Sequence, residues 1–217
     1  MGVAPPPYRI ETDRLVIRCW NPPDAPLLDE AITSSLDHLR PWMPWAVEEP
    51  RTLDERIELL RTFRGRFDLG DDFAYAIFSP DEARVLGGTG LHTRVGETAF
   101  EIGYWIRADA TGDGLATEST AALTRVAFEL CGAERVEIRV EPANEASAAI
   151  PRRLGFVEEA TLRRRLPSEE GQPARDVVVF TMLAEELAAS PCANAASTAY
   201  DAAGRPVPAS ADTSAAG

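Results

Sequence analysis

The sequence predicts an α+β fold with one mixed, mostly antiparallel sheet and helices on both faces. Two observations support this fold class. Strand-like runs follow one another over 73–79, 84–94 and 98–106, separated only by short turn segments, as in antiparallel hairpins. A helical stretch over 115–130 then leads to a strand-like run at 135–140. A single crossover helix joining two strands of one sheet requires those strands, the fourth and fifth, to lie parallel.

The remaining elements follow from the spacing of apolar residues. A β-prone run at 14–20 precedes a helical stretch that opens at Pro22. A second helix follows Thr52, because Leu53, Ile57, Leu60, Phe63 and Phe67 recur at helical spacing and Thr52 can cap the helix. After the strand at 135–140, a short helix over 144–154 ends at Gly155, and the runs 156–166 and 175–183 form a last strand pair.

The chain divides into an N-terminal extension (1–7), one folded domain (8–189) and a tail (190–217) that we expect to be disordered. The tail consists mainly of Ala, Ser, Pro, Thr and Gly, and its sizeable apolar side chains are almost limited to Tyr200 and Val207. A segment of this composition buries too little apolar surface to offset the entropy that it loses on ordering.

Composition excludes several classes of function. The chain has 217 residues, of which 45% are hydrophobic and 26% charged, as in ordinary globular proteins. The net charge of −13 repels phosphate backbones and anionic lipids, so we expect neither nucleic acid nor a membrane as partner. All 22 basic residues are arginines. A Schiff-base lysine and a phosphate-loop lysine are therefore both excluded.

Cysteine and histidine content points to a reduced, cytoplasmic protein without a metal centre. Cys19, Cys131 and Cys192 are odd in number and too widely spaced for a metal-ligand motif. The chain begins with neither a basic region nor an apolar stretch, so no signal peptide is expected. His38 and His92 are the only histidines, and we assign them surface or packing roles.

The most informative segment is Glu101-Ile-Gly-Tyr-Trp-Ile106, followed by the glycine-containing loop 111–116. A strand that leads through such a loop into a helix start places free backbone N–H groups at the positive end of the helix dipole, where a phosphate fits. The alternative interpretation is that Gly112 and Gly114 only make a tight connection.

Four segments in order resemble the GNAT acetyltransferase superfamily and, within it, the RimJ/RimL branch of ribosomal-protein N-terminal acetyltransferases. They are Glu101–Ile106, Gly112-Asp-Gly-Leu-Ala-Thr-Glu118, Asn144-x-x-Ser147 leading into Leu154-Gly155-Phe156, and Leu39-Arg-Pro-Trp-Met-Pro-Trp45. The resemblance implies a GNAT fold in which acetyl-CoA lies between the splayed fourth and fifth strands. It implies that the cofactor-binding residues are Tyr104, Trp105, Ile106, Thr111, Gly112, Asp113, Gly114, Leu115, Ala116, Thr117 and Asn144.

The chain departs from the pattern of this family at three positions. Thr111 stands where the family usually has Arg or Gln, and Asp113 stands where a basic residue is common. A lost cation and an added anion weaken pyrophosphate binding, unless Asp113 faces solvent or Arg107 or Arg152 compensates. Pro151 stands where many members have a tyrosine that acts as general acid, so no phenol is available there.

The chemistry of acetyl transfer suggests two catalytic residues. Glu101 lies on the strand that the resemblance places beside the thioester, and it could take the amine's proton directly or through water. Ser147 could donate a hydrogen bond toward the leaving thiolate, while Asn144 could orient the cofactor or a water. The alternatives are a solvated strand-edge carboxylate at Glu101 and a simple helix cap at Asn144.

We expect the acceptor to bind at Trp42, Met43 and Trp45, which Pro41 and Pro44 fix in a rigid segment that borders the acceptor cleft in the family. Core packing is the alternative. The acidic surface favours a cationic amine. The resemblance implies direct transfer to a ribosomal-type protein N-terminus. A small-molecule amine, a non-catalytic acyl-CoA-binding role and a homodimer are left open.

Overall fold

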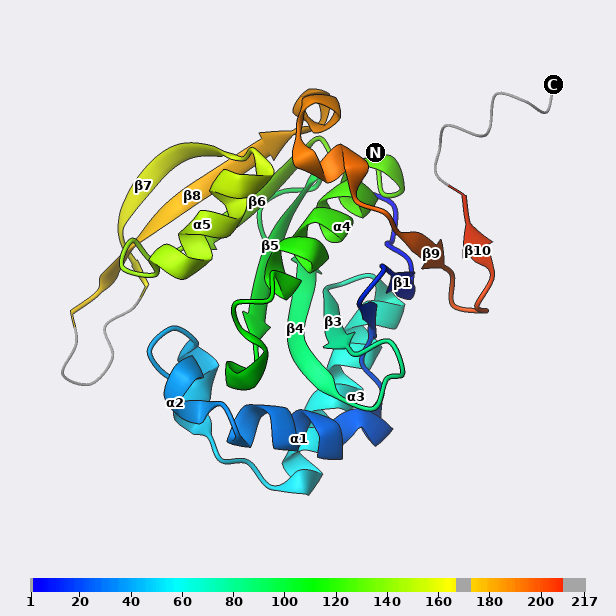
Figure 1. The fold of residues 1–217 in the computed structure, drawn as a ribbon, viewed down its shortest axis with the longest axis vertical. Coiled ribbons are helices and arrows are strands. Elements are labelled where there is room, and N and C mark those ends of the chain that lie inside the picture. The colour runs from blue at the N-terminus through cyan, green and yellow to red at the C-terminus, as the bar shows by residue number, and fades with distance from the viewer. Residues whose placement is uncertain (1, 167–172, 209–217) are drawn as a thin grey trace.

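The computed structural model describes residues 2–166 and 173–208 (Figure 1). The helices are α1 (Ala25–Thr33), α2 (Leu36–Leu39), α3 (Leu53–Leu69), α4 (Leu115–Glu129) and α5 (Glu145–Leu154). The strands are β1 (Arg9–Glu11), β2 (Val16–Cys19), β3 (Phe73–Phe78), β4 (Val85–His92), β5 (Ala99–Ile106), β6 (Arg135–Val140), β7 (Val157–Leu166), β8 (Arg175–Leu183), β9 (Thr198–Tyr200) and β10 (Pro206–Val207).

The described strands form one sheet in the order β10-β9-β1-β2-β3-β4-β5-β6-β8-β7. Within it, β2 to β5 form an antiparallel meander, and β5 and β6 lie parallel. The predicted α+β class and the parallel fourth and fifth strands are thus confirmed. Helix α4 is the crossover that joins β5 to β6, because it begins after one strand and ends before the other.

Alternating side chains of each strand reach two different cores. Phe73, Tyr75 and Ile77 of β3 pack in a core with α4, whereas Ala76 and Phe78 pack with residues of α1 and α3. Figure 1 shows α4 and α5 in front of the sheet and the α1–α3 segment at its lower end. Helices therefore cover both faces, as the sequence predicts.

Helix boundaries follow the local signals in the sequence. Thr52 caps α3 by accepting a hydrogen bond from the Glu55 N–H, and the Glu55 carboxylate accepts one from the Thr52 N–H in return. Gly70 and Gly155 end α3 and α5 in the left-handed conformation, which glycine adopts without steric strain. The residues between the helices fold as short 3₁₀ turns, among them Pro44–Glu48.

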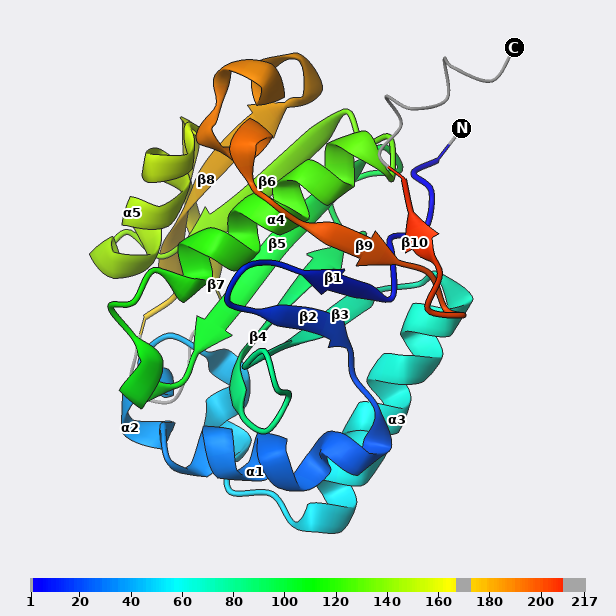
Figure 2. The same cartoon turned by 45° about the vertical axis from the view of Figure 1, so that its right-hand side comes forward.

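The expectation of a disordered tail over 190–217 is wrong for residues 190–208. Strand β9 pairs with β1, whose Ile10 lies opposite Ala199, and β10 pairs with β9 (Figure 2). Cys192 is fully buried. Backbone hydrogen bonds to the edge of β1, which the sequence did not reveal as a strand, order this segment despite its small side chains. Residues 209–217 lie outside the described residues.

The N-terminal extension also packs on the domain. The Ala4 N–H donates to the Cys131 carbonyl at 2.8 Å, and the buried Tyr75 hydroxyl donates to the Pro7 carbonyl at 2.7 Å. The folded unit therefore extends beyond the expected limits of 8 and 189 at both ends. Among the described residues, no helix combines the length and the apolar character needed to cross a bilayer.

Candidate active site

Strands β5 and β6 separate beyond their first residues. Pairing covers Ala99–Glu101 against Arg135–Glu137, whereas β5 continues to Ile106 and β6 to Val140. Beyond Glu101 the two strands no longer share a ladder, so backbone and side chains on both sides of the gap are free to contact a ligand. The position of the gap follows from the topology, because parallel neighbours joined by a crossover helix are not held together by a hairpin.

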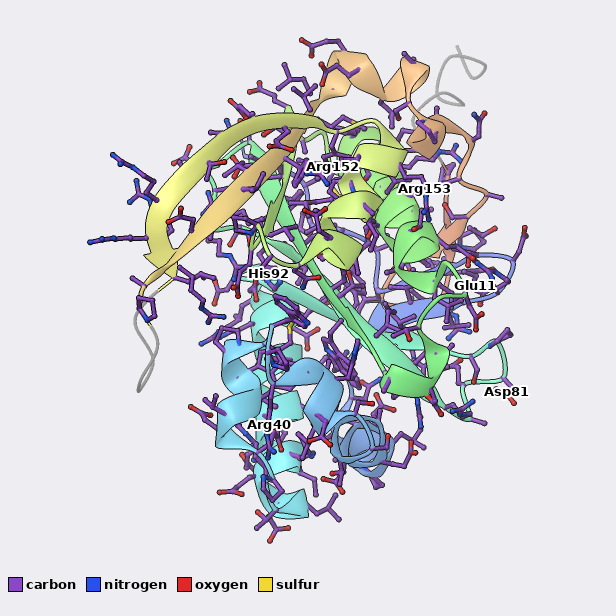
Figure 3. All side chains as sticks on the ribbon, turned by 60° about the vertical axis from the view of Figure 1, so that its left-hand side comes forward. Glu11, Arg40, Asp81, His92, Arg152 and Arg153 are labelled. Carbon is purple, nitrogen blue, oxygen red and sulfur yellow. The ribbon has the colours of Figure 1, made fainter. Side chains whose placement is uncertain are left out.

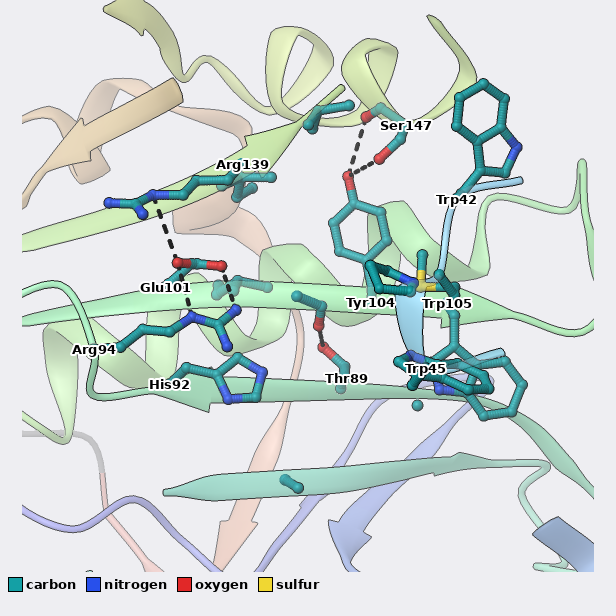
Figure 4. Close-up of a pocket in the computed structure, with 18 of the residues that line it drawn as sticks. Trp42, Trp45, Thr89, His92, Arg94, Glu101, Tyr104, Trp105, Arg139 and Ser147 are labelled. Atoms are coloured by element: carbon teal, nitrogen blue, oxygen red, sulfur yellow. Dashed lines mark hydrogen bonds and ion pairs between the residues drawn. The ribbon is translucent and has the colours of Figure 1, made fainter. Parts of the chain in front are cut away.

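A cavity of about 1120 Å³ occupies this gap and reaches both faces of the sheet (Figure 4). Glu101, Gly103 and Trp105 of β5 line it on the face of α1, and Tyr104, Asn144 and Ser147 line it on the face of α5. Its volume is at the upper end of what ligand pockets have. A ligand that enters from the α5 face can therefore meet a second ligand that enters from the α1 face.

Glu101 lies at the end of the paired segment and is buried. Both of its carboxylate oxygens accept hydrogen bonds from the Arg94 guanidinium, and the Arg139 Nε lies 3.6 Å from Oε2. The two arginines come from the residues after β4 and from β6, so the carboxylate joins three segments around the cavity (Figure 4). The alternative interpretation of Glu101 as a solvated strand-edge carboxylate is wrong, because the carboxylate is buried and paired.

Tyr104 spans the gap to α5. Its hydroxyl donates to the Ser147 carbonyl at 3.0 Å and accepts a hydrogen bond from Ser147 Oγ at 3.2 Å (Figure 4). Residue 151 would normally donate its N–H to the Ser147 carbonyl within α5, but Pro151 has no N–H. Pro151 thus leaves the Ser147 carbonyl without a helical donor, and the Tyr104 hydroxyl takes the place of the missing N–H. Burial raises the pKa of Tyr104 to about 12.

Asn144 caps α5, because its side-chain oxygen accepts a hydrogen bond from the Ser147 N–H at 3.1 Å. The capping interpretation is thus confirmed. The same residue also lines the cavity, so the cap and a contact with a ligand are compatible. The cap fixes the first turn of α5 and with it the position of the Ser147 hydroxyl.

The loop 111–116 lies beyond the end of β5 and does not line the cavity. Gly112 and Gly114 have φ angles of 89° and 78°, which residues other than glycine rarely adopt. Gly114 is the N-cap of α4. No side chain caps this helix, so the N–H groups of Leu115, Ala116 and Thr117 in its first turn face outward without intrahelical acceptors. The side chains of Thr111 and Asp113 are exposed.

Arg14 supplies a cation to this loop that the sequence did not reveal. Its guanidinium donates to the Asp113 carbonyl at 2.9 Å and pairs with Glu118 of α4. By contrast, Arg107 is buried and bound to Glu30 and Asp109, whereas Arg152 pairs with Glu145 and Glu158. The two arginines expected to compensate for Asp113 are therefore already engaged elsewhere.

The aromatic segment 42–45 lines the cavity on the α1 face. The rings of Trp45 and Trp105 meet edge to face with centroids 5.9 Å apart, and Trp45 also packs on the α1–α3 core. Trp45 thus packs in the core, as the alternative interpretation states, and also lines the cavity, while its contact with an acceptor stays a prediction. Shortly after this segment, the buried Glu49 forms a bidentate pair with the fully buried Arg56 at 2.7 and 3.1 Å, and Arg56 also pairs with Asp29 of α1.

Comparison with known proteins agrees with this geometry. The model of the acetyltransferase (GNAT) domain matches residues 14–157. The chain belongs to the GNAT acetyltransferases. It is 32% identical to YdaF of Bacillus subtilis, a proposed ribosomal N-acetyltransferase, over 80% of this chain and 93% of the relative. It is 29% identical to the ribosomal protein uS5-alanine N-acetyltransferase of Escherichia coli, over 71% of this chain and 80% of that relative.

Solved structures confirm the GNAT fold. RimJ of Mycobacterium smegmatis in complex with CoA-disulfide has a TM-score of 0.73 and 25% identity, and the match covers 89% of this chain and 92% of that one. The GNAT assignment identifies the protein as an acyltransferase, and its relatives support the RimJ/RimL branch. Across residues 2–166 and 173–208, no group of three or more His, Cys, Asp or Glu side chains is arranged to hold a metal ion.

In this GNAT acetyltransferase, the predicted site residues separate into two groups. Those that line the cavity are Trp42, Met43, Trp45, Glu101, Tyr104, Trp105, Asn144 and Ser147. Ile106 and the residues of 111–117 lie beyond it, along the loop and the start of α4. Sequence reasoning missed Asp72, His92, Arg94 and Arg139, which also line the cavity. The one local signal for His92 is the glycine-rich run Val85–His92. Glycine weakens a strand, so its repeated use there indicates that another group packs closely against the strand backbone.

Proposed function

We propose that the protein transfers the acetyl group of acetyl-CoA directly to the α-amine of a protein N-terminus of ribosomal type. The observation that carries this proposal is the cavity through the gap between β5 and β6, which gives two ligands access to one point from opposite faces. The names of the relatives from Bacillus subtilis and Escherichia coli support a ribosomal acceptor. No nucleophile suited to a covalent acyl-enzyme lines the gap among the described residues: the three cysteines are buried outside it.

The residues present fit acetyl-CoA. The first turn of α4 offers unpaired N–H groups behind two left-handed glycines, and no Cβ at Gly112 or Gly114 shields them. A pyrophosphate would bind to these groups and to the positive end of the helix dipole. RimJ of Mycobacterium smegmatis, which shares the fold, binds a CoA-disulfide. Arg14 contributes one positive charge at the loop, and Glu118 offsets it.

Acetyl-CoA supplies an activated acetyl group, whose carbonyl carbon the amine nitrogen attacks as the C–S bond breaks. The thiolate that leaves needs a proton or a hydrogen-bond donor. Ser147 supplies this donor at the gap: its hydroxyl donates to the Tyr104 oxygen and can turn toward the sulfur, whereas the Tyr104 proton is donated to the Ser147 carbonyl. Tyr104 thus positions Ser147 rather than protonating the sulfur. Glu101 holds Arg94 and Arg139 at the wall of the cavity, where it organises the acceptor side.

The charge of the protein bears on the acceptor only at long range. Among the described residues that line the cavity, the carboxylates of Glu49, Asp72, Glu101 and Glu141 are balanced by the guanidiniums of Arg51, Arg94, Arg139 and Arg165. A cationic acceptor would therefore be attracted by the net charge of −13 outside the cavity rather than by its wall. Trp45 and Trp105 would contact the apolar part of the acceptor.

The test is thiol release from acetyl-CoA with a panel of acceptors: basic peptides with free N-termini, the same peptides with blocked N-termini, and small amines. We expect release with free N-termini and none with blocked ones. The protein contributes little background, because its three cysteines are buried and burial raises their pKa, that of Cys131 to about 12. Release with small amines only would reject the ribosomal-type acceptor. No release with any amine would reject the transferase itself.

A further inference from the structure

His92, for which the sequence predicts only a surface or packing role, lies on the wall of the cavity near the middle of the molecule (Figures 3 and 4). Its side chain is 20% exposed. A Cβ at Gly90 would lie 2.8 Å from the ring atoms Cε1 and Nε2, closer than real side chains approach, and one at Gly103 would lie 3.5 Å from Nε2. Glycine on these two neighbouring strands thus makes room for the imidazole, which lies across β4 toward β5.

The ring is held in one tautomer. Nδ1 lies 2.8 Å from Oδ1 of Asp72, and an ionised carboxylate can only accept a hydrogen bond. Nδ1 therefore carries the proton, and in the neutral ring Nε2 carries the lone pair. Among the described residues, Nε2 has no hydrogen-bond partner, and it is the ring nitrogen next to Gly103 of β5. This is the arrangement in which a carboxylate orients a histidine to accept a proton.

The proposed reaction needs such an acceptor. An α-amine has a pKa of about 7.7–8.0 and a lysine amine one of about 10.4, so near neutral pH both are largely protonated and cannot attack a thioester. Histidine is the side chain that most often serves as general base in such proton transfers. Glu101 is less suited, because the Arg94 guanidinium occupies both of its oxygens.

We propose that His92, oriented by Asp72, is the general base that removes the proton from the acceptor amine. This inference rests on the proposed function and names the residue that completes it. Nε2 takes one proton from the ammonium group, directly or through a water. The freed nitrogen pair forms the N–C bond and the C–S bond breaks. The nitrogen then loses its second proton, which reaches the sulfur through water and the Ser147 hydroxyl, and His92 returns the first proton to solvent.

A first experiment reads the tautomer without any turnover. The chain has only two histidines, so ¹⁵N spectra of the protein and of the His38→Gln variant assign the His92 ring unambiguously. We expect His92 at neutral pH as the tautomer protonated on Nδ1, and a loss of that preference in Asp72→Asn. A ring protonated on Nε2 alone would overturn the proposal.

A second experiment compares His92→Gln with the wild type. We expect kcat to fall by a factor of about 10²–10⁴ at neutral pH, the usual contribution of a general base. Acetyl-CoA affinity by calorimetry should stay unchanged. The defect should shrink as the pH rises above the pKa of the amine, because a neutral amine needs no base. The groups that face the ring and could shape this profile are Asp72, Arg94, Glu101 and Arg139.

The exposed His38 provides the matched control, and His38→Gln should retain wild-type rates. If His92→Gln does not fold, Asp72→Asn carries the same kinetic test. A variant rate within twofold of the wild type, or a loss by one factor at every pH, would overturn the assignment while the transferase stands. A wild type that releases no thiol with any amine refutes the proposed function instead, and the spectra still decide the orientation of His92.

Discussion

Tyr104 and Pro151 form a pair whose coupling can be measured. The Tyr104 hydroxyl donates to the Ser147 carbonyl, which lacks its helical donor because residue 151 is proline. Replacing Tyr104 by phenylalanine removes this donor. In a Pro151→Ala background the backbone N–H of residue 151 becomes available, and the Ser147 carbonyl then keeps a donor after the same replacement. The Ser147 hydroxyl loses its acceptor in both backgrounds, so that loss cancels in the cycle.

The expected size follows from the hydrogen bonds involved. A fully buried carbonyl left without a donor costs about 1–3 kcal/mol. The Ser147 carbonyl is partly buried, so Tyr104→Phe should lower the free energy of unfolding by an amount in the lower part of that range in the wild type. In the Pro151→Ala background we expect a loss of at most about 0.5 kcal/mol, since surface-like changes that leave the carbonyl paired stay in that range. The coupling energy is then about 1–2 kcal/mol.

Chemical denaturation of the four proteins in this double-mutant cycle measures the coupling. A difference of about 1 kcal/mol corresponds to about 2–4 °C in Tm for a chain of this size, so thermal melting provides an independent reading. If the effect of the double replacement equals the sum of the two single effects to within about 0.3–0.5 kcal/mol, the reasoning is refuted, because independent sites behave in that way.

The raised pKa of Tyr104 gives a second reading of the same site. In the folded protein it ionises at about 12, whereas in the unfolded chain it ionises near the ordinary value of 10. Between these values the unfolded chain binds fewer protons, so stability falls as the pH rises. Tyr104→Phe should make this alkaline loss shallower.

Four further results are expected. Gly114→Val should abolish acetyl-CoA binding in calorimetry, because φ at 114 is 78° and valine cannot hold the loop in that conformation. If the variant binds acetyl-CoA as tightly as the wild type, the pyrophosphate does not bind at this loop. Glu101→Gln should lower kcat by a similar factor at every pH, whereas a defect confined to low pH would make it the base. Glu49→Gln should lower the free energy of unfolding by about 3 kcal/mol at most, because the buried Arg56 then keeps only the partly exposed Asp29 as an anionic partner. Glu58→Gln, which removes an exposed pair with Arg61, should cost under about 0.5 kcal/mol in the same denaturation assay. Trp45→Ala should raise KM for the acceptor at every ionic strength, because an apolar contact is lost. Added salt should raise KM of the wild type only modestly. If neither change affects KM, the acceptor is not a cationic amine that contacts Trp45.

Local patterns in the sequence were sufficient for most elements of the fold. Thr52 at the start of α3, the glycines after α3, α4 and α5, and the hairpin turns between β3, β4 and β5 act over a few residues. The same holds for the parallel arrangement of β5 and β6, because one crossover helix leaves no other connection within a sheet. Four short motifs identified the GNAT family, because they carry the backbone and helix-start geometry of its site.

Strands β1 and β9 could not be predicted in this way. Each is three residues long, and Thr198–Tyr200 lies in a segment whose composition is that of a disordered chain. β1 pairs with β2 and β9 pairs with β10 over short distances in sequence, but β9 joins the sheet only by pairing with β1, across nearly the whole length of the chain. Hydrogen bonds between segments so far apart have no signature in either segment alone.

The sequence by itself determined the order of the longer helices and of strands β2 to β8, the cleft between β5 and β6, and the chemical class of the site, since each rests on periodicity or on a motif within about ten residues. Only the tertiary structure decided which groups meet there. Arg94 and Arg139 reach Glu101 from different segments, Arg14 reaches the loop before α4, and Asp72 fixes the ring of His92. The physical reason is that a charge or a hydrogen-bond partner acts over a few ångströms, and folding rather than sequence spacing sets those distances.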